Sequence, residues 1–463
     1  MSANTVVTQP GATAQRQRMS SPWFGASLRC RVFCGCVNFV TAMTFVQVVR
    51  RLFVRGISVE DTVTWWGAWS IVLDGRGRSV YQPAAQMVAQ RDWIAIESPS
   101  QVAAWAFPPP HTFLLSPLAR LSPWGIYALL TLGSAAVWVL MIRSMVRWAR
   151  ARQWTPDATA FFASSALAFS PAMGTIRYGS FSILVVGALW NMFRLVEAPG
   201  SDRSRIARAS IWLAFAALKP QMIVFSVLGL VRRRLKVVVG SGAVLGALTI
   251  VICSFVGWGL LGDWFEVNRG LATADKNVGA PIDRMWTFKG VLTRLIGDGF
   301  ATTAGWQLVF VLSVATLAFL WSRARTADGL LGAFAASMAL QCFGFPYQSS
   351  YDAVLLVPAA LLALDIGRRR SPTLAKILAV CCVVGATFVL SGAWNEGLPG
   401  LTWRFPLPAL FVWVATGLIV VIAVHSSVRE ATDGDFGVSV GWRSKARRER
   451  SQVANRDRRA RSH

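Results

Sequence analysis

Long apolar runs separated by short basic loops make up most of the chain. A helix needs about 20 largely apolar residues to cross the hydrocarbon core of a membrane. Runs of about that length lie at 30–54, 124–146, 236–258, 303–322, 373–391 and 405–426. Each is predicted to span a membrane. The first run has arginines at its N-terminal end and no small-residue cleavage site, which indicates a retained signal-anchor with a cytoplasmic N-terminus.

Three pairs of shorter apolar runs each enclose a polar apex. Their arms lie at 158–173 and 180–196, at 207–218 and 220–231, and at 328–345 and 351–366. Each pair begins and ends in basic sequence, so each is predicted to be a helical hairpin. The second pair is too short to cross the bilayer, and its apex at Lys219 and Pro220 is expected to end inside the protein. These patterns predict an all-α polytopic membrane protein with about 12 helical membrane segments, some in short re-entrant hairpins.

One long stretch, residues 56–82, is polar, acidic and aromatic instead of apolar. The spacing of Trp65, Trp66 and Trp69 after Asp61 predicts one amphipathic helix along the outer interface, with the acid near its start. Prolines interrupt residues 107–124, and this pattern favours a short interfacial helix at 111–120.

The predicted elements divide the chain into three parts. Residues 1–29 form a cytoplasmic tail, residues 30–427 form the membrane domain, and residues 428–463 form a basic cytoplasmic tail that is expected to be disordered. External loops are expected at about 55–122, 259–302 and 392–404. This arrangement brings the outer loops and the three hairpin apices to one face.

Composition agrees with a membrane protein. The chain has 54% hydrophobic and 15% charged residues, whereas soluble domains carry about 25% charged residues. Its net charge of +25 lies mostly in short loops and in the C-terminal tail, which is a topology signal and a means of contacting anionic lipids, and no nucleic-acid motif accompanies it. The cysteines lack metal-site spacing, and three histidines leave no material for a histidine cage or a Ser-His-Asp triad. No metal and no cofactor are therefore predicted.

The ionisable residues within or against the membrane domain are the first candidates for chemistry. Asp61 is either a catalytic carboxylate or a helix cap. Lys219 lies in apolar sequence and needs either an anionic ligand or a structural partner such as Asp352. Arg177 is a weaker candidate at the first apex, and His111 either binds a phosphate or caps its helix.

Polar and aromatic side chains are candidates for sugar binding. Tyr347, Gln348 and Asp352 lie at the third apex, where they either bond sugar hydroxyls or cap the two arms. Trp65 and Tyr81 could stack on a sugar ring, and an interfacial aromatic belt is the more ordinary explanation.

These features together resemble the polyprenyl-phosphate-mannose-dependent α-(1→2)-mannosyltransferases, membrane glycosyltransferases of the GT-C superfamily. The resemblance covers about residues 55–370. It rests on Asp61 with the helix after it, on FPPPHTFLLSPLARLSP, on LKPQ at 218–221 and on PYQSSYDAVLLVPAALL at 346–362. The turn after Gly179 departs from the Gly-Gln-Asn-like pattern usual in that family.

The resemblance implies an inverting transfer of a sugar, mannose in that family, from a polyprenyl-phosphate donor to a glycolipid or glycan acceptor. Asp61 would be the general base, and Lys219, Arg177 and His111 would bind the donor phosphate. The sugar and acceptor would contact Trp65, Tyr81, Gln221, Tyr347, Gln348 and Asp352. The site would face outward from the bacterial cytoplasmic membrane.

Two other functions remain open from the sequence. A transporter or flippase of a lipid-linked saccharide would also use broken helices, with Lys219 and Asp352 lining its path. Inverted repeats are not visible, and the acidic and aromatic stretch is predicted to lie outside the membrane. A scaffold subunit with a degenerate site would bind no donor.

Overall fold

A computed structural model of the chain describes residues 26–54, 60–93, 105–198, 202–272, 285–346, 348–387 and 409–428. These residues form helices joined by turns, and the two β-bridge partners among them, Met285 and Ser349, belong to no strand. The all-α prediction is therefore confirmed. Both predicted tails lie largely outside the described residues, and the predicted loop at 392–404 lies entirely outside them.

The helices follow one another along the chain as follows. They are α2 Leu28–Val54, α3 Glu60–Leu73, η1 Gly77–Ser79, α4 Pro83–Gln90, α5 Pro109–Leu115, η3 Ser116–Arg120, α6 Pro123–Ala151, α7 Pro156–Leu167, α8 Ser170–Tyr178, α9 Ser182–Glu197, α10 Arg203–Ala216, η4 Pro220–Met222, α11 Val224–Val256, α12 Gly259–Ala272, α13 Phe288–Ile296, α14 Phe300–Arg323, α15 Ala327–Gly344, η7 Ser350–Leu355, α16 Leu356–Arg370 and α17 Pro372–Thr387. A further helix covers Ala409–Val428.

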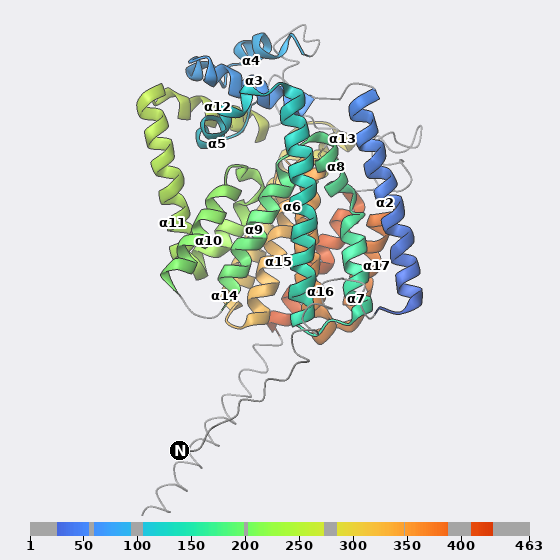
Figure 1. Ribbon diagram of the computed structural model, residues 1–463. Helices are drawn as coiled ribbons and strands as arrows, with labels where there is room; N and C mark the ends of the chain where they lie inside the picture. The colour runs from blue at the N-terminus through green and yellow to red at the C-terminus, as the bar shows by residue number, and fades with distance from the viewer. Residues whose placement is uncertain are drawn as a thin grey trace, which may run out of the picture.

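Within the described ranges, seven helical segments are long and apolar enough to cross a membrane. They are Leu28–Val46, Pro123–Ala151, Pro156–Tyr178, Val224–Val256, Phe300–Arg323, Ser350–Arg370 and Ala409–Val428. The chain is thus a multi-pass membrane protein. Figure 1 shows the long helices side by side, with α3, α4, α5 and α12 grouped at one end of the bundle.

The three predicted hairpins are present. The first turns at Gly179, whose φ of +62° is a left-handed conformation that favours glycine, between α8 and α9. The second turns at Lys219 between α10 and α11, because Pro220 cannot continue a helix. The third joins α15 to α16 through η7. The span predicted at 236–258 is instead the continuation of α11, which breaks at Arg234 (φ −137°, ψ 43°) without a loop.

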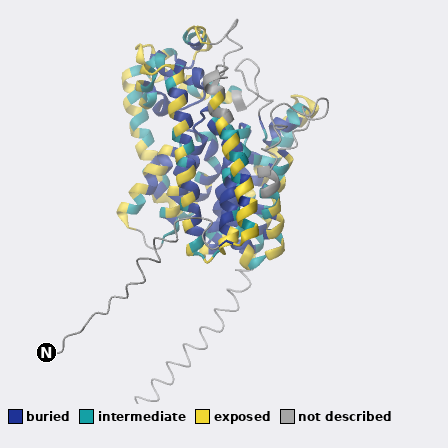
Figure 2. Ribbon diagram, turned by 45° about the vertical axis from the view of Figure 1, so that its right-hand side comes forward, coloured by how far each residue is buried: buried dark blue, intermediate teal, exposed yellow. Residues whose placement is uncertain are grey.

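The third hairpin forms the centre of the bundle. Almost every residue of α15 and the first twelve of α16 except Leu364 are buried, and Figure 2 shows this buried interior surrounded by more exposed outer helices. A helix that is apolar on all sides is expected inside a large core. The apices of the hairpins are therefore held inside protein, where unpaired polar groups are costly.

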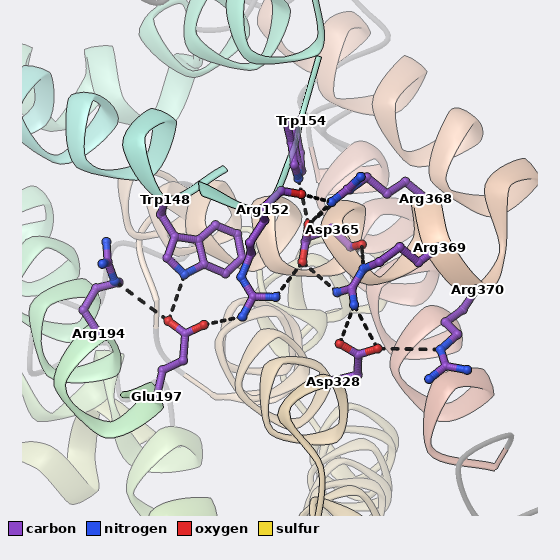
Figure 3. Close-up of polar contacts among 10 residues, drawn as sticks. All are labelled: Trp148, Arg152, Trp154, Arg194, Glu197, Asp328, Asp365, Arg368, Arg369 and Arg370. Atoms are coloured by element: carbon purple, nitrogen blue, oxygen red, sulfur yellow. Dashed lines mark hydrogen bonds and ion pairs between the residues drawn. The ribbon is translucent and has the colours of Figure 1, made fainter. Parts of the chain in front are cut away.

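A charged network closes the bundle end that lies away from α3 and α5 (Figure 3). Asp365 of α16 has a fully buried side chain, whose Oδ2 lies 3.0 Å from Arg152 Nη1 and 2.7 Å from Arg369 Nη2. Arg152 continues to Glu197 of α9 at 2.5 Å, and Arg369 continues to Asp328 of α15 at 2.8 Å. The network joins four segments that are distant in sequence.

Candidate functional site

A buried ion pair lies where the three hairpin apices meet. Lys219 Nζ of the second apex donates to Asp352 Oδ1 of the third apex at 2.5 Å. Ser182, just after the first apex, accepts from Lys219 Nζ at 2.8 Å and donates to Asp352 Oδ1 at 2.6 Å. Lys219 is 4% and Asp352 1% exposed. The structural partner Asp352, one of the two alternatives for Lys219, is therefore present.

Local backbone structure positions each member of this triad. Ser182 begins α9 directly after the left-handed turn at Gly179. Lys219 precedes Pro220 at the start of η4. Asp352 also accepts from the backbone N–H of Ser349 at 3.2 Å through its Oδ2 atom, as part of a capping box. Asp352 therefore both caps η7 and pairs with Lys219, using a different oxygen for each.

An aromatic cluster lies next to the triad. Trp65 stacks on Phe181 with ring centroids 4.5 Å apart, and His111 stacks on Phe107 at 4.3 Å. The His111 ring also lies 6.0 Å from Trp69 and 5.1 Å from Phe181. Trp65 and Trp69 are buried, so they belong to the protein interior and not to an interfacial belt.

His111 is a fully buried neutral base. Burial, and secondly the nearby charge of Lys219, lower the pKa of His111 from 6.5 to about 3. The His111 ring on α5 is therefore close to the Lys219–Asp352 pair, and its centroid lies 5.1 Å from that of Phe181, the residue before Ser182. A neutral imidazole has one donor and one acceptor nitrogen. Neither nitrogen of His111 has a hydrogen-bond partner.

Three more buried polar atoms around these groups also lack partners: Thr62 Oγ1, Trp69 Nε1 and Gln348 Oε1. Most buried polar groups are hydrogen-bonded, so several unpartnered ones close together require an explanation. Thr62 Oγ1 lies 3.4 Å from where a Cβ on Gly179 would be, which places the start of α3 against the first apex. A ligand that offers both donors and acceptors, such as a sugar, would satisfy these atoms.

The other predicted binding residues take different positions. Gln221 contributes its backbone carbonyl, which accepts from Gln348 Nε2 at 2.9 Å. The Arg177 guanidinium lies 5.7 Å from the centre of the Tyr178 ring at the first apex. Tyr81 donates to the Phe107 carbonyl at 2.7 Å and so holds the backbone of a residue in the aromatic cluster. Burial raises the pKa of the Tyr81 phenol.

Two predicted site residues cannot be placed. The backbone of Asp61 lies in the first turn of α3, but its side chain lies outside the described part of the structure, and so does all of Tyr347. Within that described part, no group of three or more histidine, cysteine or acidic side chains is arranged to hold a metal ion.

Sequence reasoning missed Ser182 and Thr62 as members of this site. Ser182 is a single hydroxyl residue between Phe181 and Ile183, and Thr62 follows Asp61 directly. Hydroxyl residues are common in apolar helices, so neither residue gives a signal without the partner that the fold supplies.

Comparison with known proteins adds one finding. A model of glycosyltransferase family 87 matches residues 105–346, about half of the chain. The matched part contains His111, Ser182 and Lys219, whereas Asp61 and Asp352 lie outside it. Searches of curated proteins and of solved structures gave no match.

Proposed function

The chain belongs to glycosyltransferase family 87, a GT-C-type membrane family, and we propose that it transfers mannose from a polyprenyl-phosphate donor to an acceptor hydroxyl. The acceptor is a glycolipid or glycan at the outer face of the cytoplasmic membrane. The observation that carries the proposal is the buried group of unpartnered polar atoms beside the Lys219–Asp352 pair, at the bundle end where α3 begins.

In the proposed reaction the Asp61 carboxylate removes the proton of the acceptor hydroxyl. The acceptor oxygen attacks the anomeric carbon of the sugar, and the bond from that carbon to the lipid-phosphate oxygen breaks. The phosphate leaves with the electron pair, and the configuration at the anomeric carbon inverts. General base catalysis of this kind contributes about 10²–10⁴-fold to a rate.

The leaving phosphate gains negative charge and needs hydrogen-bond donors. Lys219 gives one N–H to Asp352 and one to Ser182, and an ammonium has three. We assign the third N–H, the neutral His111 imidazole and the Arg177 guanidinium to the phosphate. The Trp65 indole and the Gln348 amide are assigned to the sugar or acceptor. Tyr347 and Asp352 are assigned there too, with Gln221 and Tyr81 supporting them.

The test is Asp61→Asn, assayed with polyprenyl-phosphate mannose and membrane acceptors. The neighbouring acid supplies the control, Glu60→Gln. We expect kcat to fall by about 10²-fold or more in Asp61→Asn and to change little in Glu60→Gln. Full turnover by a folded Asp61→Asn enzyme would remove the proposed base.

The same preparation separates transfer from transport. Radiolabelled sugar should become covalently attached to acceptor in membranes that contain the protein. Label that crosses sealed vesicles without becoming attached would contradict the enzymatic proposal and favour a flippase.

A further inference from the structure

A second polar site lies on the side of the molecule where the charged network closes the bundle. A pocket of about 410 Å³ opens to the surface between the end of α9, the start of α10 and the break in α11. Figure 1 shows these three helices side by side. The lining residues that the structure describes are Leu195, Val196, Arg205, Ile206, Ala209, Arg232, Arg233, Arg234, Leu235, Lys236 and Val237. Five of these eleven are basic and none is acidic.

The break in α11 explains why so many cations surround one pocket. Successive residues of a continuous helix point about 100° apart, so neighbouring basic residues would be spread around its circumference. Arg234 instead has non-helical dihedral angles, and the residues before and after it all line the same pocket. The break lies within this run of basic residues, so residues on both sides of it face the same pocket.

Two of the five cations hold the walls of the pocket. Arg233 donates to the carbonyls of Trp321 and Ser322 near the end of α14, at 3.2 and 3.1 Å. Arg234 donates to the carbonyl of Val196 near the end of α9 at 3.2 Å. All three bonds satisfy carbonyls in the last turns of α14 and α9, where intrahelical partners run out.

The two acids nearest along the chain, Glu197 and Asp202, do not line the pocket. Glu197 accepts from Arg152 at 2.5 Å and from the Trp148 indole at 2.8 Å. Asp202 caps α10 by accepting from the backbone N–H of Ser204 at 3.2 Å. The pocket therefore has an excess of positive charge, to which the exposed Arg232 and Lys236 contribute.

The residues around the pocket are suited to contact the acyl chains of a lipid. Apolar side chains complete its lining, and α11 continues from it as a membrane-spanning helix. Exposed apolar side chains follow along α10 and α11, including Trp212, Phe215, Leu228 and Val239. A headgroup in the pocket would leave its acyl chains along this face.

We infer that this pocket binds the phosphate headgroup of an anionic membrane lipid. The inference does not depend on the sugar-transfer reaction, because the pocket shares no residue with the proposed active site. Basic residues near a membrane surface each favour anionic lipid, and here they surround a formed pocket instead of an open loop.

The test uses the full-length protein in nanodiscs of phosphatidylcholine with increasing phosphatidylglycerol, and bound lipid is counted by native mass spectrometry. The variant is Arg232→Gln with Lys236→Gln. Its matched control, Arg203→Gln with Arg208→Gln, removes the same charge from exposed positions of α10 that do not line the pocket.

We expect wild type to retain phosphatidylglycerol in preference to phosphatidylcholine. The pocket variant should bind it about 30-fold more weakly, from two lost basic contacts. The control should change less than the variant. Equal weakening in variant and control would reduce the effect to general surface charge and overturn the site. Displacement of the lipid by millimolar inorganic phosphate would assign the pocket to a soluble anion and overturn the lipid assignment.

Discussion

At the scale of single residues, the protonation of His111 should link pH to stability. The folded protein keeps this imidazole neutral because its pKa is lowered to about 3. The unfolded chain takes up a proton below the ordinary value of 6.5, so acid favours unfolding. The contribution to stability is complete above the unfolded pKa and is lost as the pH falls toward the folded pKa. Between pH 7 and pH 5 the loss should be about 2 kcal/mol.

The variant that tests this linkage is His111→Phe, which keeps an aromatic ring against Phe107 and cannot take a proton. Thermal denaturation in neutral detergent at pH 8, 7 and 5 should show wild type losing more stability in acid than the variant. The values at pH 8 isolate the packing effect of the substitution. Parallel curves for the two proteins would contradict the burial of an unprotonated imidazole.

The residues of the site were partly predictable because charge is conspicuous in apolar sequence. Lys219 stands out for that reason, and its pairing with Asp352 is one of the two alternatives that the sequence leaves open. The sequence could not decide between them, because the two residues are brought together only by the packing of separate hairpins. Ser182 bonds to both charged groups, yet its short hydroxyl side chain has no distinguishing pattern.

At the scale of elements, the packing of α11 on α14 depends on Gly229. A Cβ at this position would lie 2.0 Å from Trp321 Nε1 and 2.2 Å from its Cε2. The Trp321 ring is 1% exposed and donates to Ser337 Oγ at 3.0 Å, so it has little freedom to move. Gly229→Ala should therefore destabilise the protein by about 1–3 kcal/mol through overpacking.

Gly242 provides the matched control in the same helix, because a Cβ there would meet nothing within 4 Å. Gly242→Ala should be neutral or stabilising by up to about 1 kcal/mol, since alanine favours a helix. Thermal midpoints of the two variants in one detergent measure the difference. Similar midpoints would show that α14 adjusts to the added methyl group.

The hairpins were predictable because apolar length and basic loops follow from the cost of burying charge in a membrane. The positions of the tryptophan side chains were not predictable. Trp65 and Trp69 were expected on an amphipathic interfacial helix, and they pack inside the protein against Phe181 instead. An apolar stripe has the same sequence whether it faces lipid or protein. The continuous α11 was missed for a related reason, because the basic run at its break looked like a loop.

At the scale of the whole molecule, Asp365 connects the segments that close one end of the bundle (Figure 3). Besides Arg152 and Arg369, it accepts from Arg368 Nε at 3.1 Å and Trp154 Nε1 at 2.8 Å. Asp365→Asn would leave several arginines around a neutral group, and should cost about 3 kcal/mol.

An exposed ion pair provides the comparison for Asp365. Asp74 and Arg76 lie 3.1 Å apart with side chains 57% and 50% exposed. Asp74→Asn should cost under about 1 kcal/mol, because water screens such pairs. Thermal unfolding of both variants in the same detergent tests the contrast. An Asp365→Asn protein as stable as Asp74→Asn would show that the network does not hold the bundle end together.

The orientation of the whole molecule decides whether the proposed reaction occurs outside the cell. The end of the bundle with the aromatic cluster, here called the aromatic end, carries α3 and α4. The opposite end carries the start of α10 and the arginine-rich network. Excess Arg and Lys favour the cytoplasmic side, so the aromatic end should face outward. In a chain whose seven cysteines are replaced, Asp92→Cys after α4 should react with a membrane-impermeant maleimide in intact cells. Arg203→Cys at the start of α10 should react only after permeabilisation. The reverse labelling pattern would place Asp61 inside the cell, where an acceptor on the outer surface could not reach it.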